Sequence, residues 1–252
     1  FKDLNIHITP QKLFKFRSQR VECPNCHRKF QYFCRDCGVD LLSQHCLAQQ
    51  VPVLRVPDIT LPISCTILQS KLENKKQSSI QYLQTLPISN LKIIEFDTEF
   101  SQIEPNSLLL MPSPGAVDAE QIDFSKYQNC YFLDCKWSQV QLLMQKSPDL
   151  FKCQNVVLNG YQSSFWRPHG RKFEGCLSTV ECAYFLSKVA EKKLKGVNVD
   201  DMLTYYVNNI LLIKKTMHEK GRKVVAYSRK SEQEYENWEE VAKELRGKWD
   251  LE

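Results

Sequence analysis

Short apolar runs separated by turn-forming residues occupy the middle of the chain. The runs are rich in β-branched and other apolar residues and are bounded by Pro, Gly, Asn or Ser, a pattern that predicts buried strands. They are Ile63–Leu68, Leu91–Phe96, Leu108–Met111, Cys130–Asp134 and Asn155–Leu158.

Segments with helical spacing lie between or after these runs. Ser138–Lys146 places Val140, Leu143 and Met144 on one face, and Ser178–Lys195 stops at Gly196. A longer helix is predicted from Asp200 or Asp201 to Gly221, with apolar positions Leu203, Val207, Ile210, Leu211 and Met217. The alternation of strands and helices predicts an α/β domain with a mainly parallel sheet and flanking helices.

Changes in composition divide the chain into three parts. Residues 1–50 form a basic, Cys-rich N-terminal region, and residues 51–230 carry the predicted strands and helices. Residues 231–252 place four apolar side chains at helical spacing, which predicts a C-terminal helix packed onto the domain's own core. These side chains are Trp238, Val241, Leu245 and Trp249.

Length and composition allow one large domain, with or without a small accessory module. The 252 residues are 42% hydrophobic, and no apolar run reaches the roughly eighteen residues that a membrane helix needs. The first residues lack the apolar stretch and cleavage site of a secretory signal. We therefore expect a soluble, intracellular protein with no membrane partner and no evident obligate protein partner.

Cysteine number and charge placement narrow the function classes. The eleven cysteines, an odd number, suit reduced thiols better than a disulfide framework. A net charge of +5 does not by itself indicate a nucleic-acid binder. A loop with Arg167, Arg171 and Lys172 follows Phe165 and Trp166, however, and this mixture of rings and phosphate-seeking donors predicts RNA binding.

Two CxxC pairs near the N-terminus predict a metal site. Cys23 and Cys26 are separated by seven residues from Cys34 and Cys37. Each tight turn directs two sulfurs to one point, so four thiolates can surround a tetrahedral zinc ion in a compact knuckle. The alternative is four unligated core cysteines. A four-cysteine site leaves no open coordination position, which indicates a structural zinc rather than a catalytic one.

Three element ends carry polar groups that suit chemistry. Asp134 ends a predicted strand, where ligands of parallel sheets bind, although an Asp there also serves simply to cap a turn. Ser178 and Glu181 form a capping box at a helix start, which is also a ready anion site. Gly115 lies in a turn that permits close approach of the backbone to a ligand, although such turns are often only turns.

In this order the motifs resemble those of the DTW-domain family. They are the CxxC pairs, the Ser-rich segment 73–79, the MPSPGA turn, a D-x-x-W strand end and an LST-x-E helix start. The resemblance covers roughly residues 20–230. It implies a tRNA-uridine aminocarboxypropyltransferase that uses S-adenosylmethionine as co-substrate, with a fold similar to the knotted SPOUT class. The FWR and LSTVE segments look like a eukaryotic branch, which implies a D-loop uridine at position twenty and a nuclear location.

The family motifs can be carried over residue by residue. Asp134 and Trp137 match the family's D-x-T-W, with Lys136 where threonine is usual, and are the expected catalytic residues. Arg167 stands where the family has a basic residue. The residues expected to bind S-adenosylmethionine are Ser78, Ser79, Pro112, Ser113, Gly115, Asp134, Trp137, Leu177, Ser178, Thr179 and Glu181.

Two other functions remain open from the sequence. A SPOUT-type RNA methyltransferase would share cofactor and fold but would release S-adenosylhomocysteine instead of methylthioadenosine. A non-catalytic zinc-dependent RNA-binding adaptor would bind tRNA without affinity for S-adenosylmethionine. Lys136, which departs from the family pattern, favours the adaptor, whereas the matching residues at 134, 137, 178, 179 and 181 favour the transferase.

Overall fold

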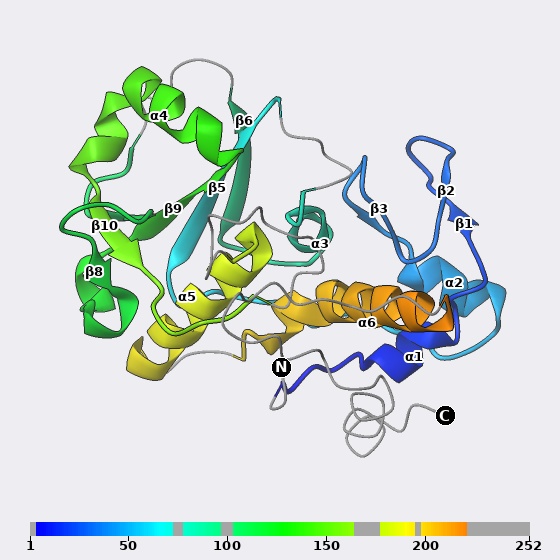
Figure 1. The fold of residues 1–252 in the computed structure, drawn as a ribbon. Coiled ribbons are helices and arrows are strands. Elements are labelled where there is room, and N and C mark those ends of the chain that lie inside the picture. Colours follow the sequence, from blue (N-terminus) through cyan, green and yellow to red (C-terminus); the bar gives the residue numbers. More distant parts are fainter. Residues whose placement is uncertain (1–3, 73–77, 97–102, 164–176, 195–197, 221–252) are drawn as a thin grey trace.

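A six-stranded parallel sheet forms the centre of the protein. The computed structural model describes residues 4–72, 78–96, 103–163, 177–194 and 198–220. The strands are β5 (Ser64–Ser70), β6 (Leu91–Phe96), β7 (Ser107–Leu110), β8 (Val117–Asp118), β9 (Asn129–Asp134) and β10 (Gln154–Val157). Their order is β6-β5-β9-β7-β10-β8, with every pair parallel (Figure 1). The prediction of a mainly parallel sheet is therefore confirmed.

All five predicted strands are present within two residues of their expected ends. The additional strand, β8, is only two residues long, too short for an apolar run to reveal it. The predicted helices correspond to α4 (Trp137–Lys146), α5 (Thr179–Leu194) and α6 (Thr204–Glu219). The longest of these predictions differs in one respect, because Asp200–Leu203 forms a 3-10 turn, η4, before α6 begins.

Helices cover both faces of the sheet because its strands are apolar on both sides. Neighbouring residues of one strand enter different clusters: Phe132 packs with α5 and α6, while Tyr131 packs with Leu143 and Met144 of α4. Ile67 and Leu68 divide in the same way. Near-continuous apolar runs are what a strand needs when it is covered on two faces.

Short 3-10 turns complete the sheet side of the molecule. They are η1 (Ala119–Gln121), η2 (Phe124–Lys126) and η3 (Pro148–Lys152). The Lys193 ammonium on α5 donates to the carbonyls of Ala119 and Ile122, which fixes the η1 turn against the helix. None of the described helices is both long and apolar enough to span a membrane.

The N-terminal region consists of two short hairpins and small helices. Strands β1 (Val21–Glu22) and β2 (Lys29–Phe30) pair antiparallel, as do β3 (Phe33–Cys34) and β4 (Val39–Asp40). Around them lie α1 (Pro10–Phe14), α2 (Leu42–Ala48) and α3 (Gln81–Gln84). Figure 1 shows the hairpins at one end of the molecule, with α6 running from the sheet toward α1.

The N-terminal region shares its core with the sheet domain. Leu13, Tyr32 and Leu42 belong to the same buried cluster as the strands, and Tyr32 stacks on Tyr205 of α6. The backbone amide of Asn5 donates to the buried Asp200 carboxylate. The boundary near residue 50 stays a prediction, as does the knot. The tail 231–252 lies outside the described residues.

Candidate active site and metal centre

Asp134 lies at the carboxyl end of β9 and binds three donors from distant parts of the chain. Its side chain is buried, with 6% of its surface exposed. Oδ2 accepts from Ser78 Oγ at 2.8 Å and from Gln69 Nε2 at 3.1 Å. Oδ1 accepts from Thr179 Oγ1 at 2.7 Å. Because β5 and β9 are parallel neighbours, Gln69 and Asp134 stand directly opposite each other at the same edge of the sheet.

A pair of serines joins this cluster to two helix starts. Ser78 Oγ accepts from the backbone amide of Ile80, which leads into α3, while donating to Asp134. Ser79 Oγ accepts from the amide of Val180 in the first turn of α5. The first-turn amides of a helix have no partner within the helix, so the serine satisfies one of them. The Ser78–Ser79 segment therefore fixes where α5 begins relative to the sheet.

Glu181 is buried under the start of α5 and organises the residues before it. Its Oε2 accepts from Ser178 N at 2.8 Å, from Ser178 Oγ at 2.8 Å and from Ser163 Oγ at 2.7 Å. The bond from the Ser178 amide is one half of the predicted capping box. Ser178 Oγ also lies 3.2 Å from the hydroxyl of Tyr206, and burial together with the nearby Glu181 charge raises the pKa of Tyr206.

The turn after β7 lies at the same edge but makes its own contacts. Ser113 Oγ accepts from Asn155 Nδ2 of β10 at 2.7 Å, and Gly115 has a φ of +81°, which favours glycine. Within the described residues, no hydrogen bond joins Pro112, Ser113 or Gly115 to Asp134. Leu177 is half-buried and directly precedes the α5 cluster. The turn is thus brought to the correct edge but not into the Asp134 network.

Trp137 is the first residue of α4 and is 45% exposed, so it is not a core residue. The residue before it, Lys136, takes the N-cap position with extended backbone angles (φ −67°, ψ 142°). An ammonium group has no lone pair, so Lys136 cannot accept a helix amide as the family's threonine would. Instead its own amide donates to Gln139 Oε1 at 3.3 Å, which leaves this helix start weakly capped.

The structure therefore brings together the strand end at Asp134 and the helix start at Thr179. Asp134 and Thr179 are 45 residues apart and share a hydrogen bond, with Ser78 on the other carboxylate oxygen. The roles of these residues stay predictions. Arg167, Arg171 and Lys172, expected to bind RNA, lie outside the described residues.

Sequence reasoning missed two members of the network. Gln69 was left out because the apolar run of its strand ends at Leu68, whereas the strand itself continues to Ser70. Extending the strand by register against Cys130–Asp134 would have placed Gln69 beside the carboxylate. Ser163 belongs to none of the predicted motifs, and no sequence pattern joins it to Glu181, 18 positions away.

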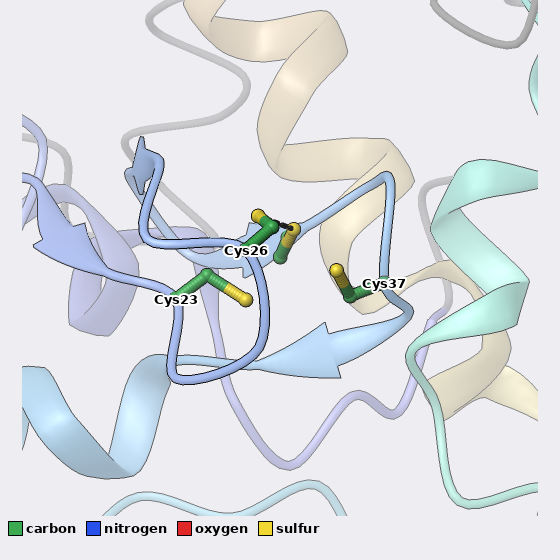
Figure 2. A group of neighbouring side chains, drawn as sticks. Cys23, Cys26 and Cys37 are labelled. Carbon is green, nitrogen blue, oxygen red and sulfur yellow. Dashed lines mark hydrogen bonds between the residues drawn. The ribbon is translucent and has the colours of Figure 1, made fainter.

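The four predicted cysteine ligands meet at one point between the two hairpins. Their sulfur atoms all lie within 4.8 Å of one another, and the Sγ atoms of Cys26 and Cys34 are 3.6 Å apart. A tetrahedral zinc with Zn–S bonds of about 2.3 Å needs sulfurs about 3.8 Å apart, so the spacing fits. Figure 2 shows the labelled residues Cys23, Cys26 and Cys37 lying around this point.

Backbone conformation and the pKa values of the thiols determine how the four cysteines can bind a metal ion. His27 and Gly38, which follow the second cysteine of each pair, both have positive φ, 57° and 65°, so each turn curls back under its sulfurs. The Arg28 backbone amide lowers the pKa of Cys26 to about 6. Loss of solvent raises the pKa of Cys37 to about 12. A metal ion must therefore displace protons from this site, and its affinity is expected to fall at low pH.

The parallel sheet, its flanking helices and the buried polar cluster at the carboxyl ends of its strands place the protein in the class of α/β proteins. In such proteins ligands bind at that edge, so the Asp134 network stands where an active site is expected. The model of the DTW domain matches residues 31–211, well over half of the chain. The protein belongs to the DTW-domain family.

One curated relative indicates the kind of reaction found among similar proteins. The chain is 26% identical over 155 residues to tRNA-uridine aminocarboxypropyltransferase 2 of Drosophila melanogaster. The aligned part covers 56% of this chain and 62% of the relative, so the chain spans less than two thirds of that protein's length.

Proposed function

We propose that this protein is a tRNA-uridine aminocarboxypropyltransferase. It would transfer the 3-amino-3-carboxypropyl group of S-adenosylmethionine to N3 of a uridine in tRNA. The observation that carries the proposal is the hydrogen-bonded cluster of Asp134, Ser78 and Thr179 at the carboxyl edge of the sheet. DTW-family membership and the tRNA-modifying relative support the same reaction.

The proposed reaction is one displacement at carbon. Uridine N3 attacks the γ-carbon of the methionyl chain, a bond forms between N3 and that carbon, and the bond from carbon to the sulfonium sulfur breaks. The bonding electrons stay on sulfur, which leaves as the neutral thioether methylthioadenosine. No acid is needed for this leaving group. The protein must align N3 with the carbon–sulfur bond and accept the N3 proton.

Asp134 is assigned the role of accepting the uridine N3 proton, either directly or through the Thr179 hydroxyl that it binds. A carboxylate offers about four acceptor positions, and three of those on Asp134 are occupied by Ser78, Gln69 and Thr179. Among the described residues no fourth donor binds this carboxylate, which leaves one position for the N3–H group. The bound donors also prevent the carboxylate from rotating, so its free position keeps one direction.

The start of α5 is assigned the amino-acid end of S-adenosylmethionine. The positive end of a helix favours a carboxylate, and Thr179 offers a hydroxyl already oriented by Asp134. Ser178 and Glu181 support this helix start from below. Trp137 and the turn with Pro112, Ser113 and Gly115 are assigned to the adenosine, since both lie at the same sheet edge and are accessible.

The metal in the four-cysteine site is proposed to be a structural zinc ion. Its ligands would be Cys23, Cys26, Cys34 and Cys37, whose spacing fits a closed tetrahedron. When bound, zinc would join the two hairpins and supply folding energy. The family resemblance adds two finer proposals, the D-loop uridine at position twenty as the target and the nucleus as the location.

Nucleoside mass spectrometry tests the function directly. The purified protein is incubated with unmodified tRNA transcript and S-adenosylmethionine, and the digested tRNA and small-molecule products are analysed. We expect uridine carrying one aminocarboxypropyl group and an equal amount of methylthioadenosine. S-adenosylhomocysteine with a methylated nucleoside would identify a methyltransferase instead. Tight tRNA binding without affinity for S-adenosylmethionine would identify an adaptor.

A further inference from the structure

The basic residues of the N-terminal region differ in the partners they have. Arg28 Nη2 lies 2.8 Å from Asp36, and the adjoining Cys26 thiolate and Asp36 raise the pKa of Arg28. Arg28 and Arg35 both lie over the ring of Phe30, at 5.9 and 5.7 Å. These two cations sit beside the cysteines, whose complex with zinc would carry a net charge of about −2. They are occupied in balancing that centre.

Four other cations of the region have no such partner, and a fifth, Lys12, donates instead to the His7 carbonyl at 3.2 Å. Lys15, Arg17, Arg20 and Lys29 are all exposed, and none lies within ion-pairing distance of a carboxylate in the parts of the chain that the structure describes. We call these four side chains the basic strip. The one acidic residue among them, Glu22, is bound to His27 Nδ1 at 2.9 Å.

The members of the basic strip are held together by the fold. The residues after α1 fold back on the hairpin, where Gln31 Nε2 donates to the Arg17 carbonyl at 2.7 Å. Arg20 directly precedes β1, and β1 pairs with β2, which carries Lys29. Like charges on adjoining segments repel one another, and a polyanion that binds them removes that repulsion.

The hairpins also stand in a fixed position relative to the Asp134 cluster. Phe33 of β3 packs edge-on against Tyr82 of α3, with ring centroids 5.9 Å apart. A Cβ on Gly38 would lie 3.4 Å from Gln84 of the same helix. Helix α3 begins at Gln81, two positions after Ser79. Figure 1 shows α3 between the hairpins and the sheet, so this helix contacts the region that carries the basic strip and adjoins the active-site cluster.

We propose that the basic strip binds the phosphate backbone of the tRNA at a distance from the uridine that reacts. The inference rests on the proposed function, since it names a second contact surface for the same substrate. Lysine and arginine side chains bind phosphates without reading sequence, so this surface would hold any correctly folded tRNA. Selection of the uridine would then be left to the sheet edge.

Replacing all four cations tests the proposal. In the variant Lys15→Ala/Arg17→Ala/Arg20→Ala/Lys29→Ala, we expect tRNA affinity to fall at least about tenfold near physiological salt. The slope of log K against log salt should become shallower by about 3 to 4, about one unit for each lost phosphate contact. Binding of S-adenosylmethionine and the melting temperature should not change, because the four side chains are exposed and none is among the residues that bind Asp134.

A matched variant controls for total charge. Lys126→Ala/Lys146→Ala/Lys152→Ala/Lys192→Ala removes four exposed lysines from η2, α4, η3 and α5, away from the hairpins. It should bind tRNA with the wild-type salt slope. If both variants lose the same number of slope units, the effect is general and the basic strip is not a specific surface. If the melting temperature falls in the first variant alone, the double variant Lys15→Gln/Lys29→Gln separates unfolding from lost phosphate contacts. It should lose about half as much of the slope of log K against log salt.

Other outcomes separate this inference from the proposed function. If the four-alanine variant binds and modifies tRNA like the wild type, the proposed role of the basic strip is wrong and the transferase assignment stands. If the wild type binds tRNA but transfers nothing, the transferase assignment fails while the salt slopes still decide the strip. If the wild type binds no tRNA, both are wrong.

Discussion

The sheet edge and the cysteine hairpins solve the same problem in different ways. Both must bring together side chains from distant sequence positions: Asp134 with Ser78 and Thr179 in one case, and the two CxxC pairs in the other. At the sheet edge the positions are fixed by six paired strands and two apolar clusters. The hairpins have strands of only two residues and a small core built largely from the cysteines themselves.

The difference predicts how each region responds to a local change. A large hydrophobic core tolerates the loss of one polar contact, because its stability is spread over many residues. Hairpins with strands of two residues bury little apolar surface, so we expect a bound metal ion to supply much of their stability. One polar contact at the seam between the two regions joins Asp40 to Tyr205, whose hydroxyl donates to Oδ1 at 2.8 Å.

Removal of the metal should have the largest effect on structure, and this effect should be confined to the hairpins. If the hairpins kept their structure, the proposed difference between the two regions would be wrong. A strong chelator, or Cys34→Ser, should unfold the hairpins at a cost on the order of 5 kcal/mol, since metal binding and folding are coupled in such sites. The sheet should retain its structure. The measurements are metal content by mass spectrometry and hydrogen exchange of residues 21–40 against the β5 and β9 amides. Cys153→Ala, a buried cysteine elsewhere, should keep its metal.

Loss of the Asp134 charge should reduce activity much more than stability. Asp134→Asn is expected to lower kcat about 10²-fold or more, because a positioned proton acceptor contributes that much. Stability should fall by only about 1 to 3 kcal/mol through the disturbed hydrogen bonds. Turnover on tRNA and urea unfolding measure the two effects. Asp58→Asn, an exposed carboxylate paired with Arg55, is the control, and near-normal kcat in Asp134→Asn would contradict the assigned role.

Thr179→Val sharpens the same point at one hydrogen bond. The change keeps the shape of the side chain and removes the donor to Asp134 Oδ1, at an expected cost of about 1 to 2 kcal/mol. If Thr179 orients the carboxylate and touches S-adenosylmethionine, the dissociation constant of S-adenosylmethionine should rise and kcat should fall. Thr179→Ser should restore most of each, since it returns the hydroxyl. Unchanged binding and turnover in Thr179→Val would exclude Thr179 from the site.

The seam should show a distinct dependence on pH. Burial raises the pKa of Asp40, so the folded state favours the neutral carboxyl group. The stability that this contributes is complete below the unfolded pKa and is lost as pH rises through the folded pKa. Asp40→Asn keeps an oxygen for Leu42 N and the Tyr205 hydroxyl but removes the titration. Its urea midpoint should therefore be flatter across mildly acidic pH and slightly higher at neutral pH; a lower midpoint would show that the charge itself is stabilising.

Lys136→Thr should have the smallest effect and should stabilise the protein. A threonine hydroxyl at this N-cap can accept a first-turn amide of α4, worth about 0.5 to 1 kcal/mol. That corresponds to a rise in melting temperature of about 1 to 4 °C for a chain of this size. Scanning calorimetry measures the shift. A change in turnover without any change in melting would instead assign Lys136 a functional role.

Much of the fold could be predicted because apolar periodicity is a local property. The β9 run ends in an aspartate that lies at the sheet edge, as the rule for parallel strands requires. The hairpin strands β1 to β4 were not predicted, because two-residue strands leave no periodic pattern. The sequence predicts an α-helix from Asp200 or Asp201, where the structure has a 3-10 turn, since both share the same acidic start and apolar spacing.

The sequence by itself determined the parts: which runs enter the sheet, which cysteines can share a metal, and which polar residues end a strand or start a helix. Those follow from local spacing. Only the tertiary structure decided that Asp134 meets Ser78, Gln69 and Thr179, and that Glu181 supports the same helix from below. Strand order and the register between strands set these meetings, and both depend on packing between residues far apart in the chain.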